Sequence, residues 1–203
     1  MAYQDTDFEP DRMMGEPFKD LTIPEELPLI PVRDSVVFSN MILPLQVGRE
    51  RSLQAVEKAL AQDRLVFLTA QKDPLKEDPA AGDLFPIGTA ALILRVMKVS
   101  EGNLKILVQG LSRARIMEFL EFEPFIRVRI ETLSDRTEVK DRVQIEALMR
   151  NVRELSEKIL SLKDLLTPDV TAILNGIEDP GQLADLVASN LRLKIDVSQE
   201  LLE

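Results

Sequence analysis

The spacing of apolar residues changes about two thirds of the way along this chain, and the change constrains its fold strongly. Before that point, short apolar runs alternate with turn residues. In one run Ile126, Val128 and Ile130 point to one side of a strand and the charged residues between them point to the other. After that point, apolar residues recur at helical spacing. The sequence therefore predicts an α+β fold, with a small, mainly antiparallel β domain over 23–133 followed by an α-helical bundle over 134–203.

The β part is expected to contain many short strands and one helix. Leu53, Val56 and Leu60 recur at spacings of three and four, which puts them on one face of an amphipathic helix packed on the strands. Gly102 can take the positive φ of a tight hairpin turn. The strands are expected at the apolar runs Leu29–Val32, Val36–Phe38, Leu45–Val47, Leu65–Ala70, Thr89–Val99, Leu104–Gln109, Arg113–Leu120 and Phe125–Leu133.

The part after residue 133 is expected to form several helices. A run without glycine or proline, from Glu138 to Leu162, carries a helical apolar stripe. Thr167-Pro168-Asp169 and Asp179-Pro180 are typical starts of further helices, because proline fits the first helical turn. Asp196 with Gln199 resembles a capping box that opens a last helix, and the chain end is expected to truncate this helix and the bundle.

The chain is acidic, with a formal net charge of −10. Acidic residues outnumber basic residues most clearly over 1–22 and 134–203, whereas 23–133 is nearly neutral. A protein that binds nucleic acid normally shows the opposite balance, so binding to DNA or RNA is not expected. Residues 1–22 mix charges, methionine, proline and glycine without periodicity, and we expect them to form a disordered acidic leader.

Several chemistries are excluded because the residue types that they need are missing. The chain contains no cysteine and no histidine, which excludes disulfides, thiol catalysis, a Ser-His-Asp triad and the commonest zinc ligands. No apolar run approaches the roughly 20 residues that span a bilayer. No secretory signal is recognisable. The sequence therefore favours a cytoplasmic protein without membrane contact, and it predicts no catalytic, cofactor-binding or metal-binding residue.

Gly176 and Gly181 are spaced like the glycines of a phosphate-binding loop. Gln182-Leu183, however, stands where such a loop requires lysine and serine or threonine, and no strand precedes the segment. We therefore expect one helix to end and another to begin here, without nucleotide binding.

Four arginines of the β part could gather on one face of a sheet. They could bind an acidic partner or nucleic acid, or they could face solvent and pair with nearby glutamates. The second interpretation is favoured because acidic residues are interleaved with them. The residues concerned are Arg113, Arg115, Arg127 and Arg129, with Glu118, Glu121 and Glu131.

The segment from Pro28 to Leu60 carries the most specific pattern in the chain. It resembles the start of the N-terminal domain of bacterial ATP-dependent Lon proteases, and the resemblance extends over roughly residues 27–203. Ser39-Asn40 departs from the pattern, because the family usually has Pro-His or Pro-Gly there. The matching positions are Pro31, Arg33-Asp34, Val37-Phe38, Pro44, Val47-Gly48-Arg49-Glu50 and Ser52.

This resemblance implies a PUA-like fold for the β domain (PUA, pseudouridine synthase and archaeosine transglycosylase) and a role in recognising protein substrates. The Lon family carries its ATPase and Ser-Lys peptidase modules further along the chain. These residues are therefore expected to be non-catalytic, with ATP and Mg²⁺ acting only in the parent enzyme. The implied partners are unfolded, damaged or degron-bearing proteins and the other subunits of a hexamer. The alternative is a free-standing PUA-like module that binds a small ligand or RNA.

Five apolar residues are candidates for contact with substrate proteins. Met41, Ile42 and Leu43 lie in a loop-like segment before a proline, and Met97 and Leu107 are expected on one face of the central hairpin. Unbranched, polarizable methionine suits surfaces that accept many sequences. The alternative is that all five belong to the core, and the sequence does not decide their exposure.

Overall fold

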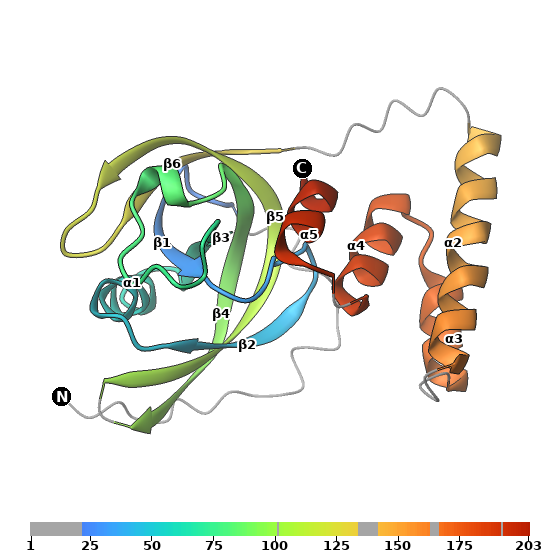
Figure 1. The fold of residues 1–203 in the computed structure, drawn as a ribbon, viewed down its shortest axis with the longest axis horizontal. Helices are drawn as coiled ribbons and strands as arrows, with labels where there is room; N and C mark the ends of the chain where they lie inside the picture. The colour runs from blue at the N-terminus through green and yellow to red at the C-terminus, as the bar shows by residue number, and fades with distance from the viewer. Residues whose placement is uncertain (1–21, 101, 134–141, 163–166, 192) are drawn as a thin grey trace.

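The computed structural model describes residues 22–100, 102–133, 142–162, 167–191 and 193–203. A strongly curved sheet with one helix forms one end of the molecule, and four further helices lie beside it (Figure 1). The elements in chain order are β1 (Glu26–Val32), β2 (Ile42–Val47), α1 (Glu50–Leu60), β3 (Leu65–Ala70), the short 3₁₀ turn η2 (Ala81–Asp83), β4 (Ile87–Ser100), β5 (Asn103–Glu121), β6 (Arg127–Thr132), α2 (Arg142–Leu162), α3 (Pro168–Gly176), α4 (Pro180–Asn190) and α5 (Ile195–Leu202).

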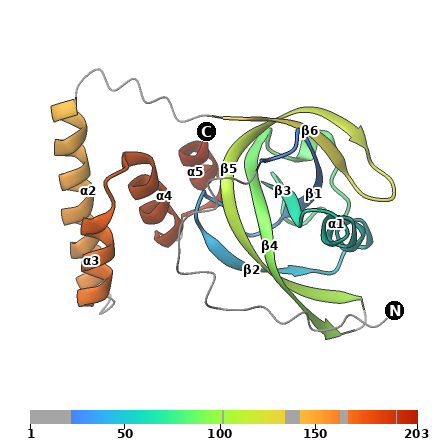
Figure 2. The same cartoon turned by 180° about the vertical axis from the view of Figure 1, so that it is seen from behind.

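The described strands form one sheet in the order β2-β5-β4-β3-β1-β6. Because β5 also pairs with β6, the strands β5-β4-β3-β1-β6 close into a ring. Strand β2 pairs with the first half of β5, at the margin of the sheet (Figure 2). The pairing of β1 with β3 is parallel and the other described pairings are antiparallel. The predicted combination of a mainly antiparallel sheet with several helices is therefore confirmed.

Strand β5 is longer than the sequence predicts. It continues through Gly110, where separate strands over 104–109 and 113–120 were expected, so the predicted break is wrong. The register with β4 shifts between Ala90 and Ala91, and β4 and β5 pair on both sides of this shift. This irregularity lets one strand pair with β2 through its first half and with β6 through its second half.

Val36–Phe38 is buried but does not form a strand, so that prediction is wrong. The segment instead joins β5 through irregular contacts, in which the backbone N–H of Asn40 donates to the carbonyl oxygen of Gly110 at 2.9 Å. A Cβ at Gly110 would lie 2.2 Å from the carbonyl oxygen of Phe38, so only glycine allows this approach. Asn40 has a φ of 59°, a left-handed conformation that asparagine tolerates better than most residues.

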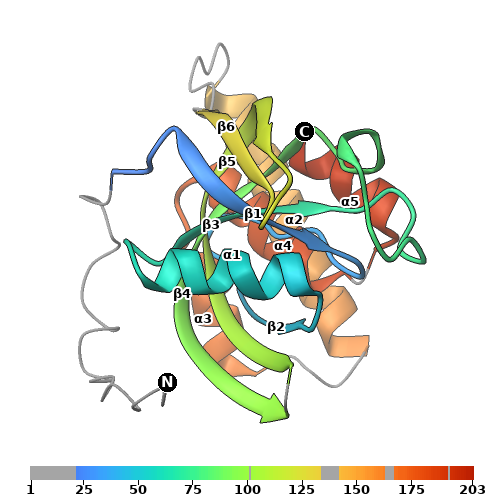
Figure 3. The ribbon, with the colours of Figure 1, turned by 90° about the vertical axis from the view of Figure 1, so that its left-hand side faces the viewer.

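The core of the β part lies between the curved sheet and α1. Helix α1 packs against β1 and β3 (Figure 3) through Ala55, Val56 and Ala59, which are fully buried. Every residue of β3 is buried. The amphipathic helix and the buried strand over 65–70 are therefore confirmed, because apolar residues on their inner faces fill the interior.

Helices α2, α3 and α4 share a second, smaller apolar core. Met149, Leu174 and Leu183 are buried there together. The Arg153 guanidinium of α2 donates to the carbonyl oxygens of Leu174 at 3.0 Å and Ile177 at 2.6 Å. These bonds provide partners for carbonyl groups in the last turn of α3 and just after it, where helical hydrogen bonds run out.

The predicted helix starts in this part are largely confirmed. Helices α3 and α4 begin at Pro168 and Pro180, and the backbone N–H of Gln182 donates to the Asp179 carboxylate at 2.7 Å. Residues 138–141, which the sequence assigns to the first long helix, lie outside the described residues. The same holds for residues 1–21, where the acidic leader is expected, and for 134–141, where the two predicted domains meet.

Helix α5 packs on the β part and continues its core. Leu202 is buried against Ile87 and Phe38. The Gln199 side-chain amide donates to the carbonyl oxygen of Ile87 at 2.9 Å, across the helix–sheet contact. The predicted capping box of Asp196 and Gln199 is wrong, because the helix begins after Lys194 without a side-chain cap and Gln199 faces the sheet instead.

Candidate functional site

Three of the five candidate residues lie on one outward face of β2, β5 and β4. Paired residues of neighbouring strands share a face, and the register pairs Ile42 with Gln109, Pro44 with Leu107 and Met97 with Lys105. Alternation along β5 then places Leu107, Gln109 and Lys105 on the same side. Ile42, Met97 and Leu107 therefore belong to one surface, which we call the outer β2–β5–β4 face.

Exposure differs among these residues. The Ile42 side chain is 54% exposed and Met97 is 38% exposed, whereas Leu107 is half-buried. Leu43 is buried in the core and Met41 is half-buried against it, so these two do not line the outer face. The β2 strand begins at Ile42, so the expectation of a loop-like segment over 41–43 is wrong and alternation turns Leu43 inward.

Two further apolar residues extend the outer β2–β5–β4 face or border it. Pro44 pairs with Leu107 and is exposed, and Val99 lies two residues after Met97 on β4 with 63% exposure. Arg95 and Lys105 add positive charge among them. Alternation along the predicted strand over 89–99 was the signal that could have found Val99, whereas Pro44 lies outside the predicted strands.

A cleft of about 740 Å³ opens between β1 and β2, beside the outer face. Its charged lining residues are Arg33, Asp34, Arg49, Glu77 and Lys105. The Arg33 guanidinium pairs with the Glu77 carboxylate at 3.2 Å.

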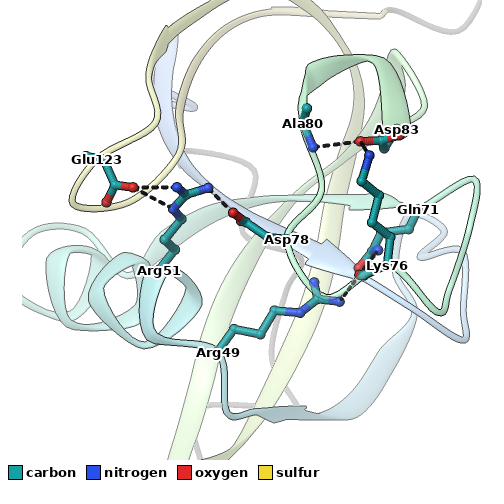
Figure 4. A network of polar contacts seen from close by, with 8 residues as sticks. All are labelled: Arg49, Arg51, Gln71, Lys76, Asp78, Ala80, Asp83 and Glu123. Carbon is teal, nitrogen blue, oxygen red and sulfur yellow. Dashed lines mark hydrogen bonds and ion pairs between the residues drawn. The ribbon is translucent and has the colours of Figure 1, made fainter.

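The loop between β3 and β4 is held against α1 by a network of polar contacts (Figure 4). Arg51 of α1 donates to the carboxylates of Asp78, at 2.6 Å, and Glu123. The bond to Glu123 is the main cause that raises the pKa of Arg51. On the other side of the loop, the Lys76 ammonium lies 2.6 Å from the Asp83 carboxylate. The network therefore fixes one wall of the cleft.

We expect acid to weaken this loop. The Lys76 ammonium, followed by the backbone N–H of Ala80, holds the pKa of Asp83 below its ordinary value of 3.8. A lowered folded-state pKa contributes stability that is present above pH 3.8 and is lost as pH falls through the folded-state pKa. Asp83→Asn should therefore lower the urea midpoint at pH 7. The difference from the natural chain should disappear in strong acid, and a constant difference at both pH values would contradict this assignment.

The arginines of β6 are engaged in ion pairs. Arg127 pairs with Glu26 at 2.9 Å and Glu121 at 2.6 Å, and Arg129 pairs with Glu118 at 2.6 Å. This pairing supports the interpretation of these two arginines as solvent-facing charges balanced by glutamates. The segment over 176–181 is likewise the end of α3 followed by the start of α4, as predicted.

Other kinds of site find no support in the described part of the chain. No group of three or more acidic side chains among the described residues is arranged to hold a metal ion. None of the described helices is long and apolar enough to cross a lipid bilayer.

A protein-family model described as the ATP-dependent protease La (LON) substrate-binding domain matches residues 26–203. The chain belongs to this Lon family. A Lon protease of Desulfovibrio desulfuricans is 50% identical over 90% of the chain, and one of Desulfatibacillum aliphaticivorans is 49% identical over the whole chain. The matches span 21% and 24% of the lengths of these Lon relatives.

Solved Lon structures share the fold. The N-terminal domain of a Mycobacterium avium complex Lon protease superimposes with a TM-score of 0.71 at 20% identity, covering 88% of this chain and 90% of that one. A Lon N-terminal domain protein from Xanthomonas campestris gives a TM-score of 0.61 at 17% identity, covering 88% and 89%. The mixed sheet with its packed helices is therefore the architecture of Lon N-terminal domains.

Proposed function

We propose that this chain captures unfolded, damaged or degron-bearing proteins for an ATP-dependent Lon protease. The family match over residues 26–203 carries this proposal. The outer β2–β5–β4 face supports it, because Ile42 and Met97 expose apolar surface that an unfolded chain can cover. Single contacts of this size are weak, so useful affinity comes from several subunits acting together.

In this proposal the chain itself does no chemistry. The Ser-Lys peptidase, and the ATPase that uses ATP and Mg²⁺, lie in the remaining length of the parent enzyme. The chain helps to assemble a cytoplasmic hexamer that passes substrates to those modules. Its net charge of −10 argues against nucleic acid as a partner.

We further infer that the β part is a PUA-like domain over 23–133 and that the helices over 134–203 form a bundle. The closed ring of strands, antiparallel except for the β1–β3 pairing, supports the first assignment. The shared core of α2, α3 and α4 supports the second. Helix α5 attaches the end of this bundle to the β part.

The outer face is tested by replacing its two most exposed candidates. Ile42→Ser and Met97→Ser should each weaken binding of reduced, carboxymethylated lactalbumin, a permanently unfolded protein, by about fivefold. The expected loss follows from giving up part of the apolar burial of one side chain. Fluorescence anisotropy with the labelled probe measures the affinity.

Leu75→Ser is the matched control, because Leu75 is 85% exposed in the loop after β3 and does not belong to the strands of the outer face. Its affinity and the melting temperatures of all three variants should match those of the natural chain. Unchanged affinity in both outer-face variants would overturn the assignment of this face.

A free-standing module for a small ligand or RNA is the alternative. The acidic balance disfavours RNA, and the arginines of β6 already have carboxylate partners. A filter-binding titration with single-stranded RNA at low salt distinguishes this alternative from the proposed capture of unfolded proteins. Retention of RNA at micromolar protein would favour the alternative.

A further inference from the structure

The sheet contains two strand edges that face each other without pairing. Strand β1 pairs with β6 over Glu26–Pro28, and after one further hydrogen bond from Leu29 to Ile126 the rest of that edge has no partner among the described strands. Strand β2 pairs with β5 along one side, and the described strands offer no partner for its other side. The cleft of about 740 Å³ lies between these edges, lined by Ile30–Ser35 of the β1 side and Leu43–Gly48 of the β2 side.

Strand alternation shows which main-chain groups of β2 face the cleft. The carbonyl oxygen of Met41 accepts a hydrogen bond from the N–H of Gly110 in β5, at 2.9 Å. The register over Ile42–Val47 has no shift, so odd-numbered residues direct their main-chain groups toward β5. Ile42, Pro44 and Gln46 therefore direct theirs toward the cleft. Pro44 agrees with this assignment, because proline has no N–H and costs no hydrogen bond at an unpaired edge.

The same reasoning applies to β1. The N–H of Leu29 donates to the carbonyl oxygen of Ile126 at 2.8 Å, whereas the carbonyl oxygen of Val32 accepts from Gln71 on the β3 side at 2.9 Å. Pro31 therefore directs its carbonyl oxygen to the side of the cleft. Both walls thus present strand edges with main-chain hydrogen-bonding groups, and each carries a proline at a position that needs no N–H.

Arg49 adds a positive charge to this cleft. Its Nε is buried and has no hydrogen-bond partner, while one Nη donates to the carbonyl oxygen of Lys76 at 3.2 Å. Burial, followed by the nearby Arg33, lowers the pKa of Arg49. Arg49 also lines a smaller pocket that shares Pro31 and Ser52 with the cleft. A half-buried guanidinium with an unused donor favours a carboxylate as its partner.

We propose that the cleft between β1 and β2 binds an extended segment of a substrate polypeptide, which adds a strand to the free edge of β2 and places a carboxylate at Arg49. A polypeptide strand is the ligand whose N–H and C=O groups repeat with the spacing of the β2 edge. This inference rests on the proposed function, but it uses main-chain groups and Arg49 rather than the apolar side chains of the outer face.

Amide hydrogen exchange tests the added strand directly in the natural chain. Saturating reduced, carboxymethylated lactalbumin should slow exchange at Ile42 and Gln46, whose N–H groups would gain partners. Leu43 and Leu45 serve as internal references, because their N–H groups already face β5. Unchanged exchange at Ile42 and Gln46 with the probe bound would overturn the proposal.

A pair of substitutions isolates the main-chain donor. Gln46→Pro removes the N–H on the free edge and leaves the ladder with β5 intact, as Pro44 does naturally. Gln46→Ala removes the same side chain but keeps the N–H. Gln46→Pro should bind the probe about 2- to 10-fold more weakly than Gln46→Ala. Equal affinities for the two folded variants would contradict strand addition.

The carboxylate is tested with two short synthetic peptides of alternating valine and threonine, one with a central aspartate and one with asparagine. The natural chain should prefer the aspartate peptide, and Arg49→Gln should remove the preference. An equal affinity of the natural chain for both peptides would overturn the role of Arg49.

These results separate the two proposals. Loss of binding in Ile42→Ser with equal affinities of Gln46→Pro and Gln46→Ala would leave the outer face standing and overturn the added strand. Failure of the natural chain to bind the unfolded probe would overturn the proposed function and the added strand together.

Discussion

Replacement of Phe67 by alanine should lower the free energy of unfolding by about 3–5 kcal/mol. Phe67 lies on β3 and is fully buried, in a cluster with Leu27 and Leu29 of β1. Packing around its ring is tight, since a Cβ at Gly88 would lie 2.8 Å from its Cζ. The surrounding strands belong to a closed sheet, so they cannot collapse into the space that the phenyl group of Phe67 leaves. Urea unfolding measures the loss.

Leu75→Ala provides the control for Phe67→Ala. Leu75 is 85% exposed in the loop after β3, so its removal should change the free energy of unfolding by less than about 0.5 kcal/mol. A loss below about 1 kcal/mol for Phe67→Ala would mean that β3 does not hold the centre of the core.

Leu202→Ala should lower the free energy of detaching α5 from the β part by about 2–5 kcal/mol. Leu202 is 1% exposed and packs near Phe38 and Ile87, which come from distant parts of the chain. Ile195, at the start of α5, packs against the edge of the same cluster, and polar contacts add to it, among them the bond from Arg113 to the carbonyl oxygen of Leu202 at 3.0 Å. Without the Leu202 side chain, water reaches these hydrogen bonds, and they stabilise the packing of α5 on the β part less.

Hydrogen exchange of the α5 amides measures this effect, because a short helix can open without global unfolding. Leu201→Ala is a close control, since Leu201 is the preceding residue of the same helix and is 53% exposed. Faster exchange in Leu202→Ala but not in Leu201→Ala is expected. Equal exchange rates in both variants would show that α5 is not anchored by its apolar side.

Much of the fold could be predicted because local sequence patterns determine many of its helices and strands. The spacing of Leu53, Val56 and Leu60 predicts α1, and the uninterrupted apolar run over 65–70 predicts the buried β3. Proline at the first helical turn predicts the starts of α3 and α4. Each of these signals depends on residues that are close in sequence.

The errors occur where distant residues decide the conformation. Val36–Phe38 has the composition of a strand, but the approach of its backbone to Gly110 leaves it irregular. Asp196 and Gln199 have the spacing of a capping box, yet Gln199 bonds to the carbonyl oxygen of Ile87. In each case a tertiary contact satisfies the polar groups better than the local arrangement does.

The outer β2–β5–β4 face shows the same difference between what local patterns predict and what tertiary contacts decide. The sequence placed Met97 and Leu107 on one face of a hairpin, and the register confirms that placement. It could not separate Ile42 from Leu43, because their directions depend on the residue at which β2 begins. The cleft between β1 and β2 left no signal apart from its two edge prolines.

By itself the sequence determined the family, the change from strands to helices and the absence of histidine and cysteine chemistry. The pairing of β5 with both β4 and β6, the packing of α5 against Ile87 and the unpaired edge of β2 were decided only in the tertiary structure. Periodicity is set by neighbouring residues, whereas strand partners and exposed faces depend on how surfaces distant in sequence fill one core.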